Sequence, residues 1–196
     1  MSDGFCFWYA DRLEREGVER FLRSLATDGV HLAHPASRIV TVLTDGPESW
    51  GEQVAVERAE LVRLLTLNSG SEVTFQLWLD EHTDMVTRFR PSADGELVVE
   101  FGLDGMRFEE QETAVRAITH VVHMDLVATR GVVVDRRGVT EDTDWDGVMR
   151  GAPVEIAVWP DVLAVRPEVA AGHPRLRSRQ GVRQTPLVFF EHRPSS

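Results

Sequence analysis

The 196-residue chain contains no lysine, and all 21 of its basic residues are arginine. The absence of lysine excludes Schiff-base chemistry, a lysine general base and the phosphate-binding lysine of a P-loop. Cysteine is scarce as well, because Cys6 has no second cysteine to pair with. An intramolecular disulfide is therefore excluded, and a thiolate metal site would lack ligands. We expect Cys6 to be a small buried hydrophobe on a first strand.

Long apolar runs and secretory signals are also missing. No apolar stretch approaches the roughly 20 residues that cross a bilayer. The N-terminal segment has Asp3 and no basic residue before its apolar stretch, which is the wrong layout for a signal peptide. We therefore expect a cytoplasmic bacterial protein with no membrane partner. The chain is long enough to bury a hydrophobic core without disulfides or structural metals, so we expect residues 1–196 to form a single domain.

Charge is distributed unevenly along the chain. Residues 1–168 carry 16 Arg against 31 Asp and Glu, whereas residues 169–196 carry five Arg against the single acid Glu191. The formal net charge of the whole chain is −11. An acidic body repels nucleic acids and anionic membranes and favours basic protein partners, while the short basic segment is suited to one anion.

Hydrophobic spacing predicts three helices, at about residues 10–26, 57–67 and 108–128. Strict alternation of apolar and polar residues predicts strands at 73–79, 84–90 and 97–102. Only short polar turns separate these strands, so we expect them to be sequential antiparallel neighbours. Further strands are expected at 37–44, 131–135, 154–159, 162–165 and 187–192.

These elements predict an α+β fold, a mostly antiparallel sheet with about three helices packed on one face. Residues that recur on the apolar side of the predicted helices and strands should form the core. They are Val18, Phe21, Leu22, Leu25, Phe75, Leu77, Val99, Phe101, Ile118 and Val122.

The segment Asp142-Thr143-Asp144-Trp145-Asp146-Gly147 matches the opening of a calcium-binding loop, in which spaced carboxylates face one cation and glycine permits the turn. The match is incomplete, because Pro153 stands where the bidentate glutamate belongs and the preceding segment is a predicted strand. Two interpretations remain, a divalent-metal site at Asp142, Asp144 and Asp146, and a solvated acidic loop. We predict no tight calcium binding.

Two His-x-x-His pairs occur, His31 with His34 and His120 with His123. Two imidazoles one helical turn apart can share a metal, but the glutamate of an HExxH motif is missing between His120 and His123. Metal binding by this pair competes with the ordinary interpretation of histidines at the border of an amphipathic helix.

A polar cluster of Asp80, Glu81, His82 and Asp84 lies at an expected hairpin tip. These groups are suited to general acid/base work, although hairpin tips are usually polar and solvated. Trp78 stands on the polar side of its strand, so it is either covered or an exposed binding anchor.

The stretch from residue 173 to residue 186 shows no secondary-structure pattern and carries Arg175, Arg177, Arg179 and Arg183 without a neighbouring acid. Such segments are often functional or disordered. These arginines either fold back onto the acidic body or bind a phosphate or carboxylate.

The leading hypothesis is a cytoplasmic acidic binding protein that acts through its surface, for example an immunity-type inhibitor or regulator of a basic partner protein. No cofactor and no nucleic-acid partner is indicated, and the sequence leaves the oligomeric state open. One alternative is a small enzyme with a pocket between sheet and helices that uses residues such as His82, His120 and Asp125. Another is a divalent-metal or small-molecule sensor that uses the Asp142–Gly147 loop.

Overall fold

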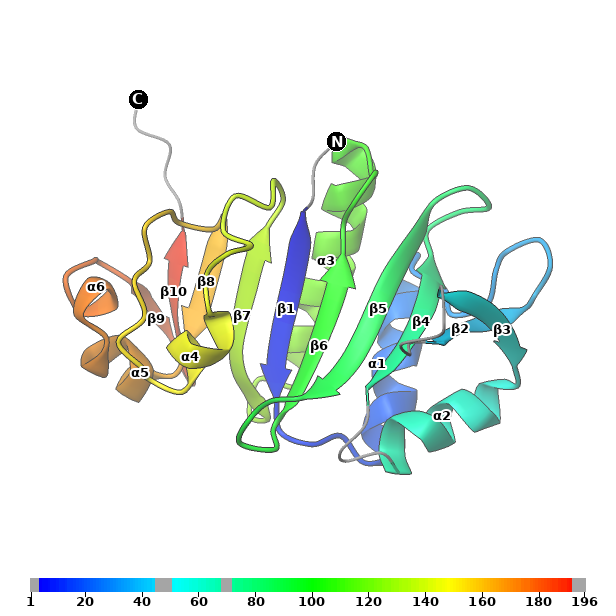
Figure 1. Ribbon diagram of the computed structural model, residues 1–196, viewed down its shortest axis with the longest axis horizontal. Helices are drawn as coiled ribbons and strands as arrows, with labels where there is room; N and C mark the ends of the chain where they lie inside the picture. The colour runs from blue at the N-terminus through cyan, green and yellow to red at the C-terminus, as the bar shows by residue number, and fades with distance from the viewer. Residues whose placement is uncertain (1–3, 45–50, 68–71, 192–196) are drawn as a thin grey trace.

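The computed structural model describes residues 4–44, 51–67 and 72–191 (Figure 1). Its strands are β1 (Phe5–Ala10), β2 (Val40–Thr44), β3 (Glu52–Val56), β4 (Val73–Trp78), β5 (Asp84–Pro91), β6 (Leu97–Gly102), β7 (Thr129–Asp135), β8 (Val162–Val165), β9 (Val182–Gln184) and β10 (Leu187–Glu191). Its helices are α1 (Arg15–Thr27), α2 (Arg58–Leu67), α3 (Phe108–Met124), α4 (Trp145–Met149), α5 (Pro167–Gly172) and α6 (Pro174–Arg177).

The ten strands of the described ranges form one antiparallel sheet in the order β3-β2-β4-β5-β6-β1-β7-β8-β10-β9. The three strands predicted from alternation, β4, β5 and β6, are sequential neighbours, because Phe75 pairs with Thr87 and Phe89 pairs with Val99. Strand β1 then pairs with β6 on one side and with β7 on the other. The mixed α+β class and the antiparallel sheet are thus confirmed.

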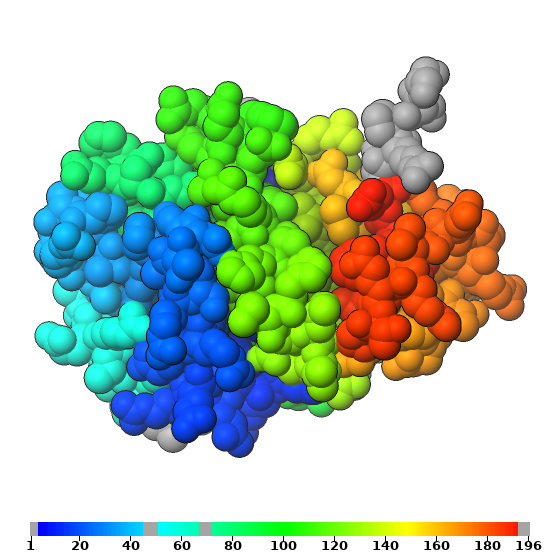
Figure 2. All heavy atoms as spheres, turned by 180° about the vertical axis from the view of Figure 1, so that it is seen from behind, coloured from blue at the N-terminus to red at the C-terminus, as the bar shows by residue number. Residues whose placement is uncertain are grey.

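Helices α1, α2 and α3 cover one face of the sheet, and Figure 2 views α1 and α3 from that side. Trp8 of β1 stacks on Phe21 of α1 with ring centroids 5.8 Å apart. Ile118 and Val122 of α3 and Leu61 of α2 enter the same core. All ten side chains expected in the core are buried in it, which confirms that prediction. Cys6 is buried there too, and burial raises the pKa of its thiol to about 12.

The expectation of about three helices on one face is wrong, because the described residues contain six helices and they lie on both faces. The three short helices α4, α5 and α6 cover a second core that includes Trp145, Val148, Leu176 and Phe190. This second core exists because β7 and β8 are apolar on both sides, so each of their faces needs a cover. None of the described helices is long and apolar enough to cross a membrane.

Two predicted helices differ from the structure at their ends. The helix expected from residue 10 begins at Arg15, because residues 5–10 form the central strand β1 and Ala10 is still buried in the sheet. The helix expected to reach residue 128 ends at Met124. Residues 125–128 instead form turns, in which the Thr129 amide donates to the carbonyls of Asp125 and Leu126.

The strand expected at 154–159 does not form. This segment crosses the second core as extended chain with Ile156 buried. The carbonyl of Val154 accepts from the His173 ring, and the carbonyl of Ile156 accepts from Arg175, so side chains replace a strand ladder as its partners. The last expected strand matches β10 as far as Glu191, and its final residue, His192, lies outside the described residues.

Two strands lack a sequence prediction. They are β3 and β9, the two edges of the sheet, and their residues are almost all exposed. An edge strand without a buried face has no alternation to detect. The strand expected at 37–44 begins at Val40, because the preceding residues form a closed turn, and it lies between β3 and β4 as an interior strand.

We predict that Val122→Asp destabilises the protein by about 3 kcal/mol or more, because an unpaired charge would enter the core between α3 and the sheet. Val127→Asp is the matched control, since that valine is 84% exposed. Urea unfolding monitored by tryptophan fluorescence measures both. Equal free energies of unfolding for the two variants would contradict the packing of α3.

Candidate functional site

The face of the sheet that carries the second core is covered along only part of its width. Helices α4, α5 and α6 lie over the β7, β8 and β10 part, whereas no described helix lies over β4, β5, β6 and β1 (Figure 1). Strand alternation and register place Phe7, Val86, Arg88, Arg90 and Glu100 side by side on this uncovered part. We call it the open face.

A groove of about 410 Å³ lies on the open face. Phe7, Thr74, Val86 and Gly102 line it together with the charged residues Arg88, Glu100 and Asp104. Val86 is 43% exposed, which is high for a valine in an interior strand. An apolar centre with a charged rim is the usual anatomy of a surface that binds another protein.

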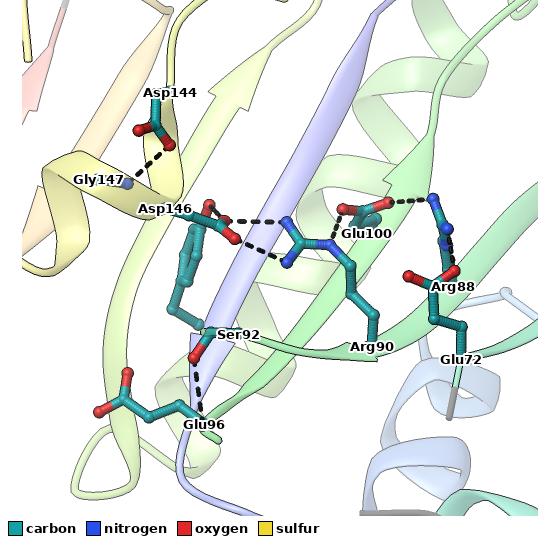
Figure 3. A network of polar contacts seen from close by, with 10 residues as sticks. Glu72, Arg88, Arg90, Ser92, Glu96, Glu100, Asp144, Asp146 and Gly147 are labelled. Carbon is teal, nitrogen blue, oxygen red and sulfur yellow. Dashed lines mark hydrogen bonds and ion pairs between the residues drawn. The ribbon is translucent and has the colours of Figure 1, made fainter. Parts of the chain in front are cut away.

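Two arginines of β5 form a continuous ladder with carboxylates beside this groove (Figure 3). Arg90 donates to both oxygens of Asp146 at 2.8 and 2.9 Å and also to Glu100. Arg88 contacts Glu100 at 3.8 Å and also Glu72. Each guanidinium therefore has two carboxylate partners.

The ladder continues to β1, because the Tyr9 hydroxyl donates to Asp146 at 2.8 Å. Partial burial alone would raise the pKa of Asp146, but the hydrogen bonds from Arg90 and Tyr9 outweigh it, so this pKa is below its ordinary value. Burial and the charge of Asp146 raise the pKa of Tyr9, and the hydrogen bond to Asp146 raises the pKa of Arg90. Asp146 and Arg90 therefore stay ionised, and Tyr9 stays a donor, at neutral pH.

Carboxylates outnumber guanidiniums around the groove. The carboxylates are those of Glu72, Glu100, Asp104 and Asp146, and the guanidiniums are those of Arg88 and Arg90. Because both arginines are already held by acids, neither guanidinium is free to meet an anion. The open face therefore favours a cationic group over an anion.

The Asp142–Gly147 segment starts helix α4. The Asp144 carboxylate accepts from the Gly147 amide at 2.8 Å and caps the helix. Trp145 is buried in the second core, and Asp146 points to Arg90 (Figure 3). A Cβ at position 147 would lie 2.4 Å from the Asp144 carboxylate and 2.7 Å from Val154, so only glycine fits there.

The three candidate calcium ligands therefore have different surroundings. Asp144 caps α4, Asp146 binds Arg90 and Tyr9, and Asp142 is exposed in the preceding turn. Within the part of the chain that the structure describes, no group of three or more His, Cys, Asp and Glu side chains is placed to hold a metal ion. The absence of tight calcium binding stays a prediction.

The histidine pair on α3 does not converge on one point. His120 contacts Asp28 at the end of α1, while the His123 ring contacts the carbonyl of Thr119 at 2.8 Å. Asp125 in turn lies 3.5 Å from Arg20. The structure therefore gives His120 and Asp125 separate partners, and it does not join them with His82 in a single site.

The polar cluster at residues 80–84 builds a turn. The Asp80 carboxylate accepts from the amides of His82 and Thr83 at 2.7 and 2.8 Å, and these hydrogen bonds lower its pKa. Asp84 belongs to β5 and accepts from the Gln76 side chain at 2.8 Å. Glu81 and His82 are exposed at the tip.

Trp78 lies at the end of β4, on the same face as the groove. Its backbone bridges to His31, and the His34 ring packs edge-to-face against its indole with centroids 4.4 Å apart. The side chain is half-buried, and its Nε1 has no hydrogen-bond partner among the described residues. A loop rather than a helix thus covers Trp78, and part of the ring remains accessible.

The arginine segment is structured, which corrects the expectation of a patternless stretch. Arg175 and Arg177 belong to α6, and Arg183 belongs to β9. Arg179 stacks over Trp159 at 4.0 Å and donates to the carbonyl of Glu191 at 2.9 Å. Because Arg175 and Arg179 donate to backbone carbonyls, they hold the C-terminal elements together.

The arginine–carboxylate ladder was missed from sequence, although one signal for it exists. Arg88 and Arg90 alternate with apolar residues on the predicted strand 84–90, and Glu100 does so on 97–102. Charged residues of both signs at matching register positions indicate cross-strand pairs on an uncovered face. The third partner, Asp146, is 56 residues from Arg90, so no local pattern connects them.

No family model and no curated protein sequence matches the chain. A solved structure with a similar fold is that of the Pseudomonas aeruginosa T6SS protein PA0821, with a TM-score of 0.50 and 12% sequence identity. The similarity covers 96% of this chain but 64% of that one, so this chain spans less than two thirds of the other protein. At this identity the likeness concerns the fold alone.

We predict that Asp146→Asn lowers the free energy of unfolding by about 2 kcal/mol at pH 7, because Arg90 loses one of its two ionic partners. The pKa of Asp146 is below its ordinary value of 3.8, so its stabilisation is present above that pH and is lost as the pH falls below it. The difference between wild type and variant should therefore shrink between pH 4 and pH 3, as measured by urea titrations.

Asp144→Asn is the matched control, because asparagine caps a helix about as well as aspartate. This variant should unfold like the wild type at both pH values. A pH-independent loss in Asp146→Asn would show that the ion pair with Arg90 is not its cause.

Proposed function

We propose that this protein is a binding protein that docks a basic protein partner on its open face and inhibits or regulates it, in the manner of an immunity-type inhibitor. The observation that carries the proposal is the apolar groove of Phe7 and Val86 within an acid-rich rim. Docking there would cover an exposed valine and pair the excess carboxylates with cationic groups of the partner.

The charge of the whole chain supports the same partner class. A net charge of −11 attracts cationic proteins over distances of about one Debye length, roughly 10 Å at 0.1 M salt. The same charge opposes nucleic acid, because phosphates would meet the acidic body before reaching Arg175 or Arg183. Electrostatic attraction brings the partner to the surface, and the apolar groove then provides contact area.

The name of the structural neighbour is compatible with this proposal. That protein is described as a T6SS protein, which is compatible with an immunity-type or secretion-related role. Because the sequence identity is 12%, a role similar to that of the neighbour is part of the proposal alone.

We predict that Val86→Arg abolishes the association with a basic partner, because it places a cation and a long side chain in the centre of the groove. The test is co-expression with the products of adjoining genes, followed by affinity measurement with the purified basic protein that co-purifies. Val127→Arg, at an exposed valine outside the groove, is the control and should bind like the wild type.

Salt provides an independent check on the same complex. Affinity should fall as salt rises from 0.1 to 1 M, because the Debye length shrinks from about 10 Å to about 3 Å. Binding that survives both Val86→Arg and 1 M salt would refute the open face as the docking surface. Tight DNA or RNA binding that is lost on replacing Arg175, Arg177, Arg179 and Arg183 would overturn the acidic-binder proposal.

A further inference from the structure

A second cavity lies on the opposite face of the sheet from the groove, at the β3 edge and on the side of α1 and α2. Its volume is about 700 Å³, within the range of pockets that hold small molecules. In Figure 2 the light-blue segment around residues 31–40, the blue α1 and the cyan start of α2 surround this region. We call it the edge pocket.

Apolar side chains form much of the edge pocket. Leu32 and Val40 are buried in the core beneath it, and Val56 packs against the same core. Ile39, at 46% exposure, adds an apolar side chain that is open to solvent. A ligand with an apolar body would remove mainly the surfaces of Ile39 and Val56 from water, which is favourable in proportion to the area covered.

Three basic side chains line the same pocket, namely His31, Arg38 and Arg58. Arg58 is already engaged, because it donates to Glu19 at 2.7 Å. Arg38 and His31 have no side-chain partner among the described residues. The acid in the lining is Glu57, and it is exposed. Arg38 and His31 are exposed as well, so both side chains are open to a ligand that arrives from solvent.

The segment that carries Arg38 is held firmly in place. The His34 amide donates to the Ile39 carbonyl at 2.9 Å, and the Arg38 amide donates to the His34 carbonyl at 2.8 Å. The His34 ring nitrogen Nδ1 accepts from the amides of Ala36 and Ser37. Two backbone hydrogen bonds between His31 and Trp78 fix the start of the segment to β4. The pocket wall is therefore preformed.

Arg38 itself has a φ of 61°, the left-handed conformation that costs free energy for a residue with a side chain. Glycine would adopt this conformation without strain. The backbone alone therefore gives no reason for an arginine at this position, whereas a guanidinium at the mouth of an apolar pocket is suited to a carboxylate or sulfonate.

We propose that the edge pocket binds a small organic anion, with the apolar body of the ligand on Leu32, Val40, Val56 and Ile39 and its anionic group on Arg38. The neighbouring His31 adds a further polar contact for that group. This site is separate from the open face and does not depend on the proposed protein partner.

The experiment uses 8-anilinonaphthalene-1-sulfonate, an anion with an apolar body whose fluorescence rises in apolar surroundings. The wild-type protein should bind it saturably with one site per chain. Arg38→Gly should weaken binding about tenfold, the effect of losing one charge-assisted contact. Because glycine relieves the left-handed strain, its melting temperature should equal or exceed that of the wild type, which separates lost binding from lost folding.

Arg23→Gln, on the exposed side of α1, is the matched control and should bind the dye like the wild type. Octanoate should displace the dye about ten times more effectively than 1-octanol, because only octanoate offers Arg38 an anion. Equal dye affinity of Arg38→Gly and wild type, equal displacement by the two competitors, or the absence of saturable binding would each overturn the proposal.

Discussion

Strand β1 joins the two halves of the sheet, because its backbone pairs with β6 along one edge and with β7 along the other. Its side chains alternate between the two cores, with Trp8 in the core beneath α1 and α3 and Tyr9 in the core beneath α4. The rest of the architecture depends on this strand, since among the described strands the halves on either side share no other pairing. Its partner β7 lies more than 100 residues away in sequence, a separation that slows folding.

The arginine–carboxylate ladder links these halves on the open face. Arg90 of β5 reaches Asp146 of α4, and Tyr9 of β1 donates to the same carboxylate. A sheet face without a covering helix is exposed to solvent. On the open face, ion-paired side chains occupy strand positions where β-branched residues would otherwise be exposed to water. The exposed pair of Arg88 and Glu72 stabilises the fold only modestly, whereas the mostly buried pair of Arg90 and Asp146 sets the position of α4 and the border of the groove.

The parts of the fold that were predictable from sequence are those specified by local periodicity. Strands β4, β5 and β6 and the buried sides of α1 and α3 follow from alternation or helical spacing over a few turns. The short helices α4 and α6 contain too few residues to show a period, so they were not predictable in this way. The segment around Ile156 resembles a strand in composition, yet its carbonyls bond to His173 and Arg175, which only the tertiary fold brings near.

The candidate surfaces were less predictable, because each depends on where charges meet in space. The calcium-like motif is a helix cap in the structure, because Asp144 accepts from the Gly147 amide while Asp146 binds Arg90 instead of facing the same point. In the same way, the net charge of a chain does not show where its charged residues lie in the fold. The chain that presents excess carboxylates beside Val86 also leaves Arg38 without a carboxylate partner among the described residues. Screening in salt solution limits the reach of each group to about one Debye length, so the electrostatics of the open face and of the edge pocket are set by their own neighbouring residues rather than by the net charge of the chain.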